Sequence, residues 1–284
     1  MSKENAICVE NLTKRFGDVA ALEAVNVTFG ENKIYGLLGR NGAGKSTLLN
    51  VITNRLFPTG GRVLIDGQPA MENDQALGKL YCMSEKDLYP ETLRVKEVFS
   101  YTKLFYPSFD TAYANDLCKQ FGLDPKKKLK GLSTGYTSIF KLIVALASGA
   151  SYLLLDEPVL GLDANHRELF YKLLLELYSE HPKTIILSTH LIEEVSDLIE
   201  QVVIIKQGKI LLDQPVEEVL KLGYCVSGKA SEVDAYAAGK QILSEESLGG
   251  LKTVCIQGRA GQVPETLEVT ALDLQKLFIK LTNA

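Results

Sequence analysis

The chain has 284 residues, of which 46% are apolar and 23% charged, so it can bury one large core with a small appended segment. Its net charge of -4 provides no overall basic field, which argues against nucleic acid as a partner. The longest uncharged stretch, residues 142–155, falls short of the roughly 20 apolar residues that a membrane span needs. We therefore expect any membrane association to come through a partner.

The five cysteines are scattered, with no Cys-x-x-Cys pair and no neighbouring histidine cluster. They are Cys8, Cys82, Cys118, Cys225 and Cys255. This spacing favours reduced thiols in a cytosolic protein. The N-terminus, Met-Ser-Lys-Glu-Asn, has neither the apolar core of a signal peptide nor an arginine-rich transit pattern. We expect the protein to remain in the cytoplasm.

Short apolar runs alternate with helical patterns, which predicts an α/β fold with a mostly parallel sheet wrapped by helices. Residues 1–30 and 62–66 instead resemble an antiparallel β edge layer. The clearest strands of the main sheet are residues 34–38, 152–155, 185–187 and 202–205. Because these runs are continuously apolar, we expect them to be covered on both faces.

Residues 39–46 match the pattern G-x-x-x-x-G-K-[ST], between a predicted strand and a helical run. The glycines let backbone N–H groups form an anion nest, and the next helix points its positive end at phosphates. Lys45 would contact the β- and γ-phosphates, and the Ser46 hydroxyl would ligate Mg²⁺. The expected nucleotide-binding residues are Gly39, Arg40, Asn41, Gly42, Ala43, Gly44, Lys45, Ser46 and Thr47.

Residues 88–147 change to helical segments with aromatic and charged side chains, which indicates a helical subdomain within a domain of residues 1–222. After residue 223 the chain becomes richer in small and polar residues, with Gly249 and Gly250 as a turn signal. We interpret residues 223–284 as a small C-terminal α+β extension. No internal repeat is evident.

The apolar run 152–155 is followed by two acids, Asp156 and Glu157. Paired with the phosphate loop, Asp156 is the expected Mg²⁺ partner and Glu157 the base that orients and deprotonates the attacking water. Because side chains alternate along a strand, neighbouring acids can serve the metal and the water separately.

These motifs, together with residues 132–136, resemble the ATPases of ATP-binding cassette (ABC) transporters across residues 3 to 215. Leu132-Ser133-Thr134-Gly135-Tyr136 is similar to the family's L-S-G-G-Q signature. The resemblance implies a P-loop NTPase core and a head-to-tail dimer, in which Ser133 and Gly135 clamp the γ-phosphate of the partner's ATP. Thr134 and Tyr136 depart from the pattern, and Tyr136 puts the usual glutamine contact in doubt.

Three further residues gain a role from the resemblance. His190, after the predicted strand 185–187, resembles the switch histidine that links the γ-phosphate to the catalytic glutamate, although a lone histidine is more often structural. Asp163 matches the loop through which the two subunits sense each other, with helix capping as the alternative. Phe16 resembles the aromatic residue that stacks on adenine, with core packing as the alternative.

The family usually places a glutamine near the Mg²⁺ shell after the strand that here corresponds to residues 81–83, but this sequence has none. We predict that Ser84 takes its place and that Glu85 turns toward the helical subdomain and the permease. A shift of one residue would select Glu85 instead. Both could also be ordinary loop residues.

The resemblance implies an ATP-hydrolysing subunit that uses ATP and Mg²⁺ on the cytoplasmic face of the membrane, in a dimer bound to a permease. The extra C-terminal segment and the L-S-T-G-Y variant resemble ATPases of bacterial ABC-2-type exporters for peptides, antibiotics or lipids. An importer ATPase is the alternative within transport. An ABC ATPase without a permease is a further alternative, although neither a second cassette nor a long coiled coil is evident.

Overall fold

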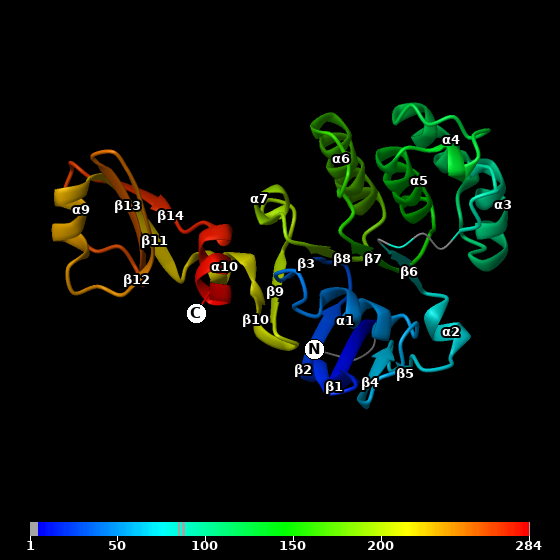
Figure 1. Ribbon diagram of the computed structural model, residues 1–284, viewed down its shortest axis with the longest axis horizontal. Helices are drawn as coiled ribbons and strands as arrows, with labels where there is room; N and C mark the ends of the chain where they lie inside the picture. The colour runs from blue at the N-terminus through cyan, green and yellow to red at the C-terminus, as the bar shows by residue number, and fades with distance from the viewer. Residues whose placement is uncertain (1–4, 85, 87–88, 284) are drawn as a thin grey trace.

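The computed structural model describes residues 5–84, 86 and 89–283, and within them the strands form three sheets (Figure 1). The first sheet is antiparallel, in the order β2-β1-β4-β5. Its strands are β1 (Ala6–Phe16), β2 (Val19–Gly30), β4 (Gly60–Ile65) and β5 (Gln68–Pro69). This sheet is the antiparallel edge layer that the sequence predicted.

The central sheet has the order β10-β9-β3-β8-β7-β6, and every neighbouring pair is parallel except β9 and β10. Its strands are β3 (Ile34–Leu38), β6 (Leu80–Met83), β7 (Tyr152–Asp156), β8 (Thr184–Thr189), β9 (Gln201–Lys206) and β10 (Lys209–Pro215). All residues of β3, β7 and β8 are buried, so the prediction of strands covered on both faces is confirmed.

Alternate residues of the central strands enter two different cores. Leu37, Leu154 and Ile186 pack with the antiparallel sheet and α1 (Lys45–Ile52). Leu155 and Leu187 belong to the other core, which includes the helices beyond the sheet. Because side chains alternate between the two faces of each strand, the central sheet packs against the antiparallel sheet on one face and the helices on the other.

Helices α3 (Val95–Phe105), α4 (Thr111–Gln120) and α5 (Thr134–Leu146) gather beside β6 (Figure 1). They form the predicted helical part, although its expected start at residue 88 lies outside the described residues. α5 is buried almost all round from Ile139 to Leu146 because it packs between the sheet and the other helices. The 3-10 turn Leu129–Gly131 also belongs to this part. Elsewhere before the C-terminal segment lie α2 (Asp74–Leu77), α6 (Ala164–Glu180), α7 (Ile192–Val195) and α8 (Val216–Leu220).

The C-terminal segment forms a third, antiparallel sheet in the order β12-β13-β11-β14. Its elements are β11 (Gly223–Lys229), α9 (Ala230–Ala237), β12 (Ile242–Leu248), β13 (Leu251–Gln257), β14 (Glu268–Ala271) and α10 (Leu274–Asn283). Gly249 and Gly250 form the predicted turn, between β12 and β13. One face of the sheet packs on α9. α10 returns to pack against the main core, where Leu277 and Phe278 are buried.

The register of β11 and β13 places Cys225 opposite Cys255, and the two form a disulfide. The expectation of reduced thiols was therefore wrong for this pair, because sheet pairing joins residues that are 30 positions apart in sequence. Cys8, Cys82 and Cys118 are free thiols. Burial raises the pKa of both the Cys82 and the Cys118 thiol to about 11.

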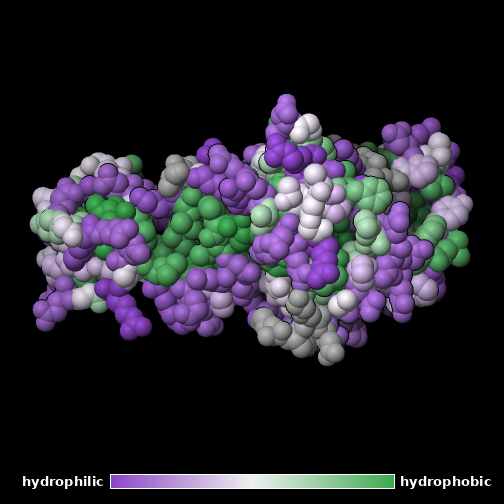
Figure 2. Space-filling view, turned by 90° about the horizontal axis from the view of Figure 1, so that it is seen from below, coloured by the Kyte–Doolittle hydropathy of each residue, from purple (hydrophilic) through white to green (hydrophobic). Residues whose placement is uncertain are grey.

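Figure 2 shows apolar side chains gathered where the C-terminal segment meets the rest of the molecule. Several exposed apolar residues lie on the segments that meet there: Leu211 on β10, Leu222 just before Gly223, and Ile279 on α10. None of the described helices is long and apolar enough to cross a membrane.

Candidate nucleotide-binding and active site

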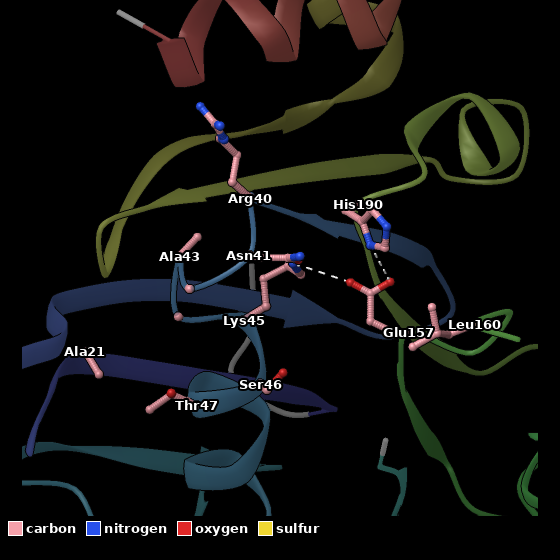
Figure 3. A pocket seen from close by; sticks show the side chains of 12 residues that line it. Ala21, Arg40, Asn41, Ala43, Lys45, Ser46, Thr47, Glu157, Leu160 and His190 are labelled. Carbon is pink, nitrogen blue, oxygen red and sulfur yellow. Dashed lines mark hydrogen bonds and ion pairs between the residues drawn. The ribbon is translucent and has the colours of Figure 1, made fainter. Parts of the chain in front are cut away.

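A cavity of about 490 Å³ opens at the carboxyl end of β3, between the predicted phosphate loop and the ends of β7 and β8 (Figure 3). Its walls combine the loop with residues from distant parts of the chain. They are Ala21, Arg40, Asn41, Gly42, Ala43, Gly44, Lys45, Ser46, Thr47, Glu157, Leu160 and His190. Most of the residues predicted to bind the nucleotide or to catalyse its hydrolysis thus share one cavity.

The phosphate loop follows β3 directly and needs glycine at two tight positions. A Cβ on Gly39 would lie 2.7 Å from the carbonyl oxygen of Ile205. Gly44 has a φ of +113°, and a Cβ there would lie 2.8 Å from the carbonyl oxygen of Ala21. Side chains are therefore excluded where the loop passes β9 and β2, which explains the glycines of the motif.

α1 begins at Lys45, directly after this loop. In the described chain, no side chain caps its N-terminus and no acidic residue lies in its first turn. The first N–H groups of a helix have no intrahelical partner and carry a partial positive charge. The end of α1 that faces the cavity is therefore suited to bind an anion.

Glu157 is the centre of a polar network (Figure 3). One carboxylate oxygen lies 3.5 Å from the ammonium nitrogen of Lys45, which also donates to the carbonyl oxygen of Gly39 at 2.7 Å. The other lies 3.0 Å from Nδ1 of His190 and accepts from the Thr189 hydroxyl at 3.3 Å. The φ of Glu157 is +48°, an unfavourable value for a residue with a side chain. These contacts hold the carboxylate toward the phosphate loop.

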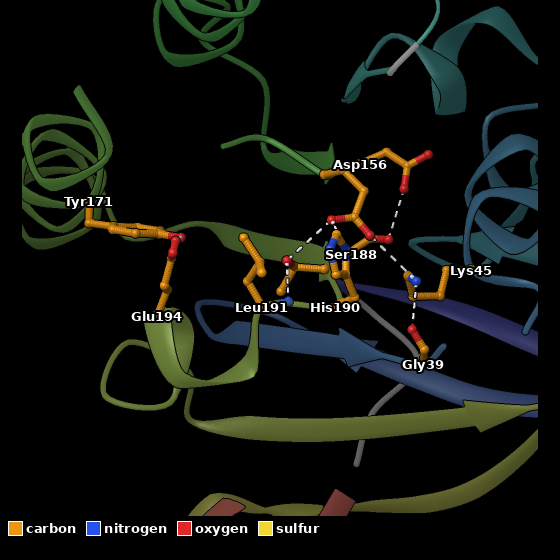
Figure 4. Close-up of polar contacts among 10 residues, drawn as sticks. Gly39, Lys45, Asp156, Tyr171, Ser188, His190, Leu191 and Glu194 are labelled. Atoms are coloured by element: carbon orange, nitrogen blue, oxygen red, sulfur yellow. Dashed lines mark hydrogen bonds and ion pairs between the residues drawn. The ribbon is translucent and has the colours of Figure 1, made fainter. Parts of the chain in front are cut away.

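Asp156, the residue before Glu157, is buried, with 5% of its surface exposed. One of its oxygens accepts from the Ser188 hydroxyl at 2.8 Å (Figure 4). Asp156 and the Ser46 hydroxyl are hard oxygen donors, which suit Mg²⁺. Among the described residues there is no group of three or more His, Cys, Asp or Glu that could hold a metal ion. The donors therefore fit a Mg²⁺ ion that takes its other ligands from nucleotide phosphates and water.

A second cavity, of about 300 Å³, also has Glu157 in its wall. It is lined by Ser84, Lys141, Asp156 and Glu157 among others. The Ser84 hydroxyl accepts from the backbone N–H of Lys86 at 3.3 Å. Ser84 thus lies beside the acid pair, while the alternative residue, Glu85, lies outside the described residues.

The signature residues lie at the exposed start of α5. Ser133 caps that helix, accepting from the N–H of Tyr136 at 3.3 Å. A Cβ on Gly135 would lie 3.0 Å from the carbonyl oxygen of Gly161, so glycine allows the helix to approach that loop. Neither Ser133 nor Gly135 lines the cavity at the phosphate loop of the same chain.

Asp163 caps α6 through the backbone N–H of His166 at 2.9 Å, and this hydrogen bond lowers the pKa of its carboxyl group. Asp163 therefore forms the helix cap that was its alternative interpretation, and the role of Asp163 between subunits stays a prediction. Phe16, at the end of β1, is 48% exposed, with the Lys14 ammonium 5.0 Å from its ring centroid. Such exposure disfavours core packing, while adenine stacking remains a prediction.

Sequence reasoning missed several residues of the site. Ser188 and Thr189 directly precede His190 in the sequence, so the end of the predicted strand was a usable signal for both. Ala21 reaches the cavity because β2 lies against the loops that carry Ala43 and Gly208. The residues around Ala21 form no local sequence pattern that would predict this tertiary contact.

A phosphate loop between a buried parallel strand and a helix, facing two acids at the end of another strand, defines a P-loop nucleoside triphosphatase. The family model described as "ABC transporter" matches residues 22–160. The chain is 30% identical to the petrobactin import ATP-binding protein YclP of Bacillus subtilis, over 75% of this chain and 88% of that one. It is 28% identical to the ABC transporter ATP-binding protein YtrB of the same organism, over 75% of each chain.

Among solved structures, a dimeric ATP-binding cassette in a post-hydrolysis state bound to ADP and Pi has a TM-score of 0.66 and 26% identity. The match covers 74% of this chain and 98% of that one. The chain thus belongs to the ATP-binding subunits of ABC transporters. It is an ATP hydrolase with the fold of an ABC cassette.

Proposed function

We propose that this ATPase works as a dimer on the cytoplasmic face of a membrane, where it powers export through a separate permease. The network around Glu157 carries the proposal, because it joins the phosphate loop, the acid pair and the strand end that carries His190. The domain division goes with it: residues 1–222 form the ATPase domain and residues 223–284 an accessory segment.

In the proposed mechanism, Glu157 orients and deprotonates the attacking water, and His190 holds the carboxylate and contacts the γ-phosphate. Lys45, once ATP binds, exchanges its contact with Glu157 for the β- and γ-phosphates. Ser46 and Asp156 would hold Mg²⁺, which would neutralise developing charge on the phosphates. Positioning and electrostatics supply most of the acceleration in such a site.

The dimer proposal rests on the exposed position of Ser133, apart from the phosphate loop of its own chain. We expect Ser133 of one subunit to face Lys45 of the other when ATP is bound. Single cysteines at Arg40 and Thr134, combined in a Glu157→Gln chain, test this by ATP-dependent disulfide crosslinking between subunits. A cysteine at Leu104 in place of Thr134 is the control. If no crosslink forms with ATP and permease present, the composite site is wrong.

An apolar groove of about 480 Å³ beside β6 supports a permease partner. It is lined by Tyr81, Tyr89, Pro90, Leu93, Val98, Tyr101, Thr102, Phe105 and Tyr106. Phe105 is 78% exposed there. We propose that an apolar helix of the permease docks in this groove, which adjoins the strand leading to Ser84.

The docking proposal predicts that Phe105→Asp abolishes co-purification with the permease from solubilised membranes, because it places a charge in an apolar contact. Leu248→Asp, at a site 85% exposed on the C-terminal hairpin, should leave co-purification intact. Retention of the permease by Phe105→Asp would place the interface elsewhere.

The export direction rests on the C-terminal segment and the L-S-T-G-Y variant of the signature. The relative YclP is named as an import protein, so import is the second candidate. Identifying the co-purifying membrane protein, and adding candidate substrate-binding proteins to the reconstituted transporter, separates the two. Stimulation of ATP hydrolysis by a substrate-binding protein would favour import and contradict export.

A further inference from the structure

Lys141 is a buried cation beside the nucleotide site, and none of the roles described above uses it. It lies on α5 with 8% of its surface exposed. Its ammonium group donates to the carbonyl oxygen of Ser84 at 3.3 Å, joining two segments that are 57 residues apart in sequence. Because burying an ammonium group is costly, lysine is rarely this buried without a compensating partner.

The surroundings of Lys141 supply such partners. The 300 Å³ cavity has Lys141 and Thr137 of α5 in its walls, together with Asp156 and Glu157 from the end of β7. One ammonium group and two carboxylates therefore border the same small volume. Charges in a confined, partly dehydrated space interact more strongly than they do in bulk water.

We propose that Lys141 is a positioning residue of the ATPase site. Its hydrogen bond fixes the chain at Ser84, and its charge offsets the carboxylates of Asp156 and Glu157 while the metal is absent. The proposal rests on the roles proposed above for Asp156 and Glu157. It links α5 to the segment of Ser84, the residue that the sequence predicted near the Mg²⁺ shell.

The two contributions of Lys141 predict separable effects. Loss of the charge removes one of the cations near the two carboxylates, another being Lys45 at 3.5 Å from Glu157, so a divalent cation should bind more tightly. Loss of the hydrogen bond frees the chain at Ser84, so hydrolysis should slow even when metal and nucleotide are saturating. Lys141→Met removes both, Lys141→Gln keeps a donor without the charge, and Lys141→Arg keeps both.

The test uses the full chain and two measurements, Mn²⁺ binding with ADP by electron paramagnetic resonance and kcat for Mg-ATP. We expect Lys141→Met to bind Mn²⁺ about 3- to 10-fold more tightly, from the loss of one nearby charge at a high effective dielectric constant. We expect its kcat to fall about tenfold or more, as for a lost positioning contact. Lys141→Gln should keep the Mn²⁺ effect with a smaller loss of kcat, and Lys141→Arg should resemble the wild type.

Lys103→Met, which removes an exposed lysine of α3, is the matched control and should change neither quantity. Unchanged or weaker Mn²⁺ binding in Lys141→Met overturns the proposal, whatever happens to kcat. If Lys141→Met does not fold, Lys141→Gln decides by the same Mn²⁺ criterion. A Glu157→Gln chain that hydrolyses ATP at the wild-type rate would refute the role of Glu157 without changing the Mn²⁺ result.

Discussion

The phosphate-loop end of the molecule and the C-terminal segment are organised by different physical constraints. At the phosphate loop, glycine geometry and a few charges determine the structure. Gly44 leaves room for the backbone of Ala21, and the Lys45 ammonium group donates to the carbonyl oxygen of Gly39. In the C-terminal segment, apolar packing determines it, through Val226 and Val254 against α9 and Leu277 against the main core. Substitutions at the first end should therefore change catalysis, and substitutions in the second should change stability.

The largest effect that we expect is on hydrolysis by Glu157→Gln. The glutamine keeps the size of the side chain but cannot accept a proton from water. We predict a fall in kcat of roughly 10² to 10⁴, the usual contribution of a positioned general base, with ATP binding retained. Single-turnover hydrolysis and equilibrium binding of ATP measure the two quantities.

Glu193→Gln, an exposed substitution on α7, is the control for the change in charge. It should hydrolyse ATP at the wild-type rate. A Glu157→Gln protein with the same kcat as this control would remove the main distinction between the two ends, because the central acid of the network would then have no catalytic role.

The second largest effect should come from Leu277→Ala on α10. Leu277 is 3% exposed within the main core, so its truncation leaves a cavity. We expect the free energy of unfolding to fall by about 2 to 5 kcal/mol, the range for burying alanine in place of leucine. Urea denaturation measures this change.

Ile279→Ala on the same helix is the control, because Ile279 is 46% exposed. It should lower the free energy of unfolding much less. If the two variants are equally stable, α10 is not held by its apolar face, and the packing half of the comparison is contradicted.

The sequence was most informative where backbone chemistry is local. The residues of β3, the phosphate loop and the strand that ends at Asp156 lie where their patterns predicted, because glycine requirements and continuous apolar runs constrain each segment on its own. The two-residue turn at Gly249 was predictable for the same reason.

The sequence was least informative where distant segments meet. No sequence pattern near Cys225 indicates that the pairing of β11 with β13 places it opposite Cys255. The sequence of α10 likewise does not show that this helix packs against the main core. Lys141 was not singled out either, since one lysine in an apolar helix indicates no partner until Ser84 is placed beside it.

A smaller effect is expected for Phe16→Ala, which tests a residue at the catalytic end that lies outside the main cavity. If its half-exposed ring stacks on the base, removing the ring should raise the KM for ATP about fivefold, from a loss on the order of 1 kcal/mol. The kcat should not change, because stacking on the base contributes equally to ground and transition states. Phe57→Ala, at another half-exposed ring, is the control. An unchanged KM would show that the Phe16 ring does not contact the bound nucleotide.

The smallest effect should come from Ile256→Val in β13. Ile256 is 1% exposed and packs in the small core under α9, so losing one methylene should lower the free energy of unfolding by about 0.5 to 1.5 kcal/mol. Neither kcat nor KM should change, because this face of the sheet is turned away from the main core.

Ile186→Val in β8 deletes the same methylene beneath the catalytic strand end and is the matched comparison. Denaturation and steady-state hydrolysis of both variants sharpen the distinction: we expect a similar loss of stability in both and unaltered kinetics in Ile256→Val. A lower kcat in Ile256→Val would show that the small core communicates with the active site, and the two ends would no longer be independent.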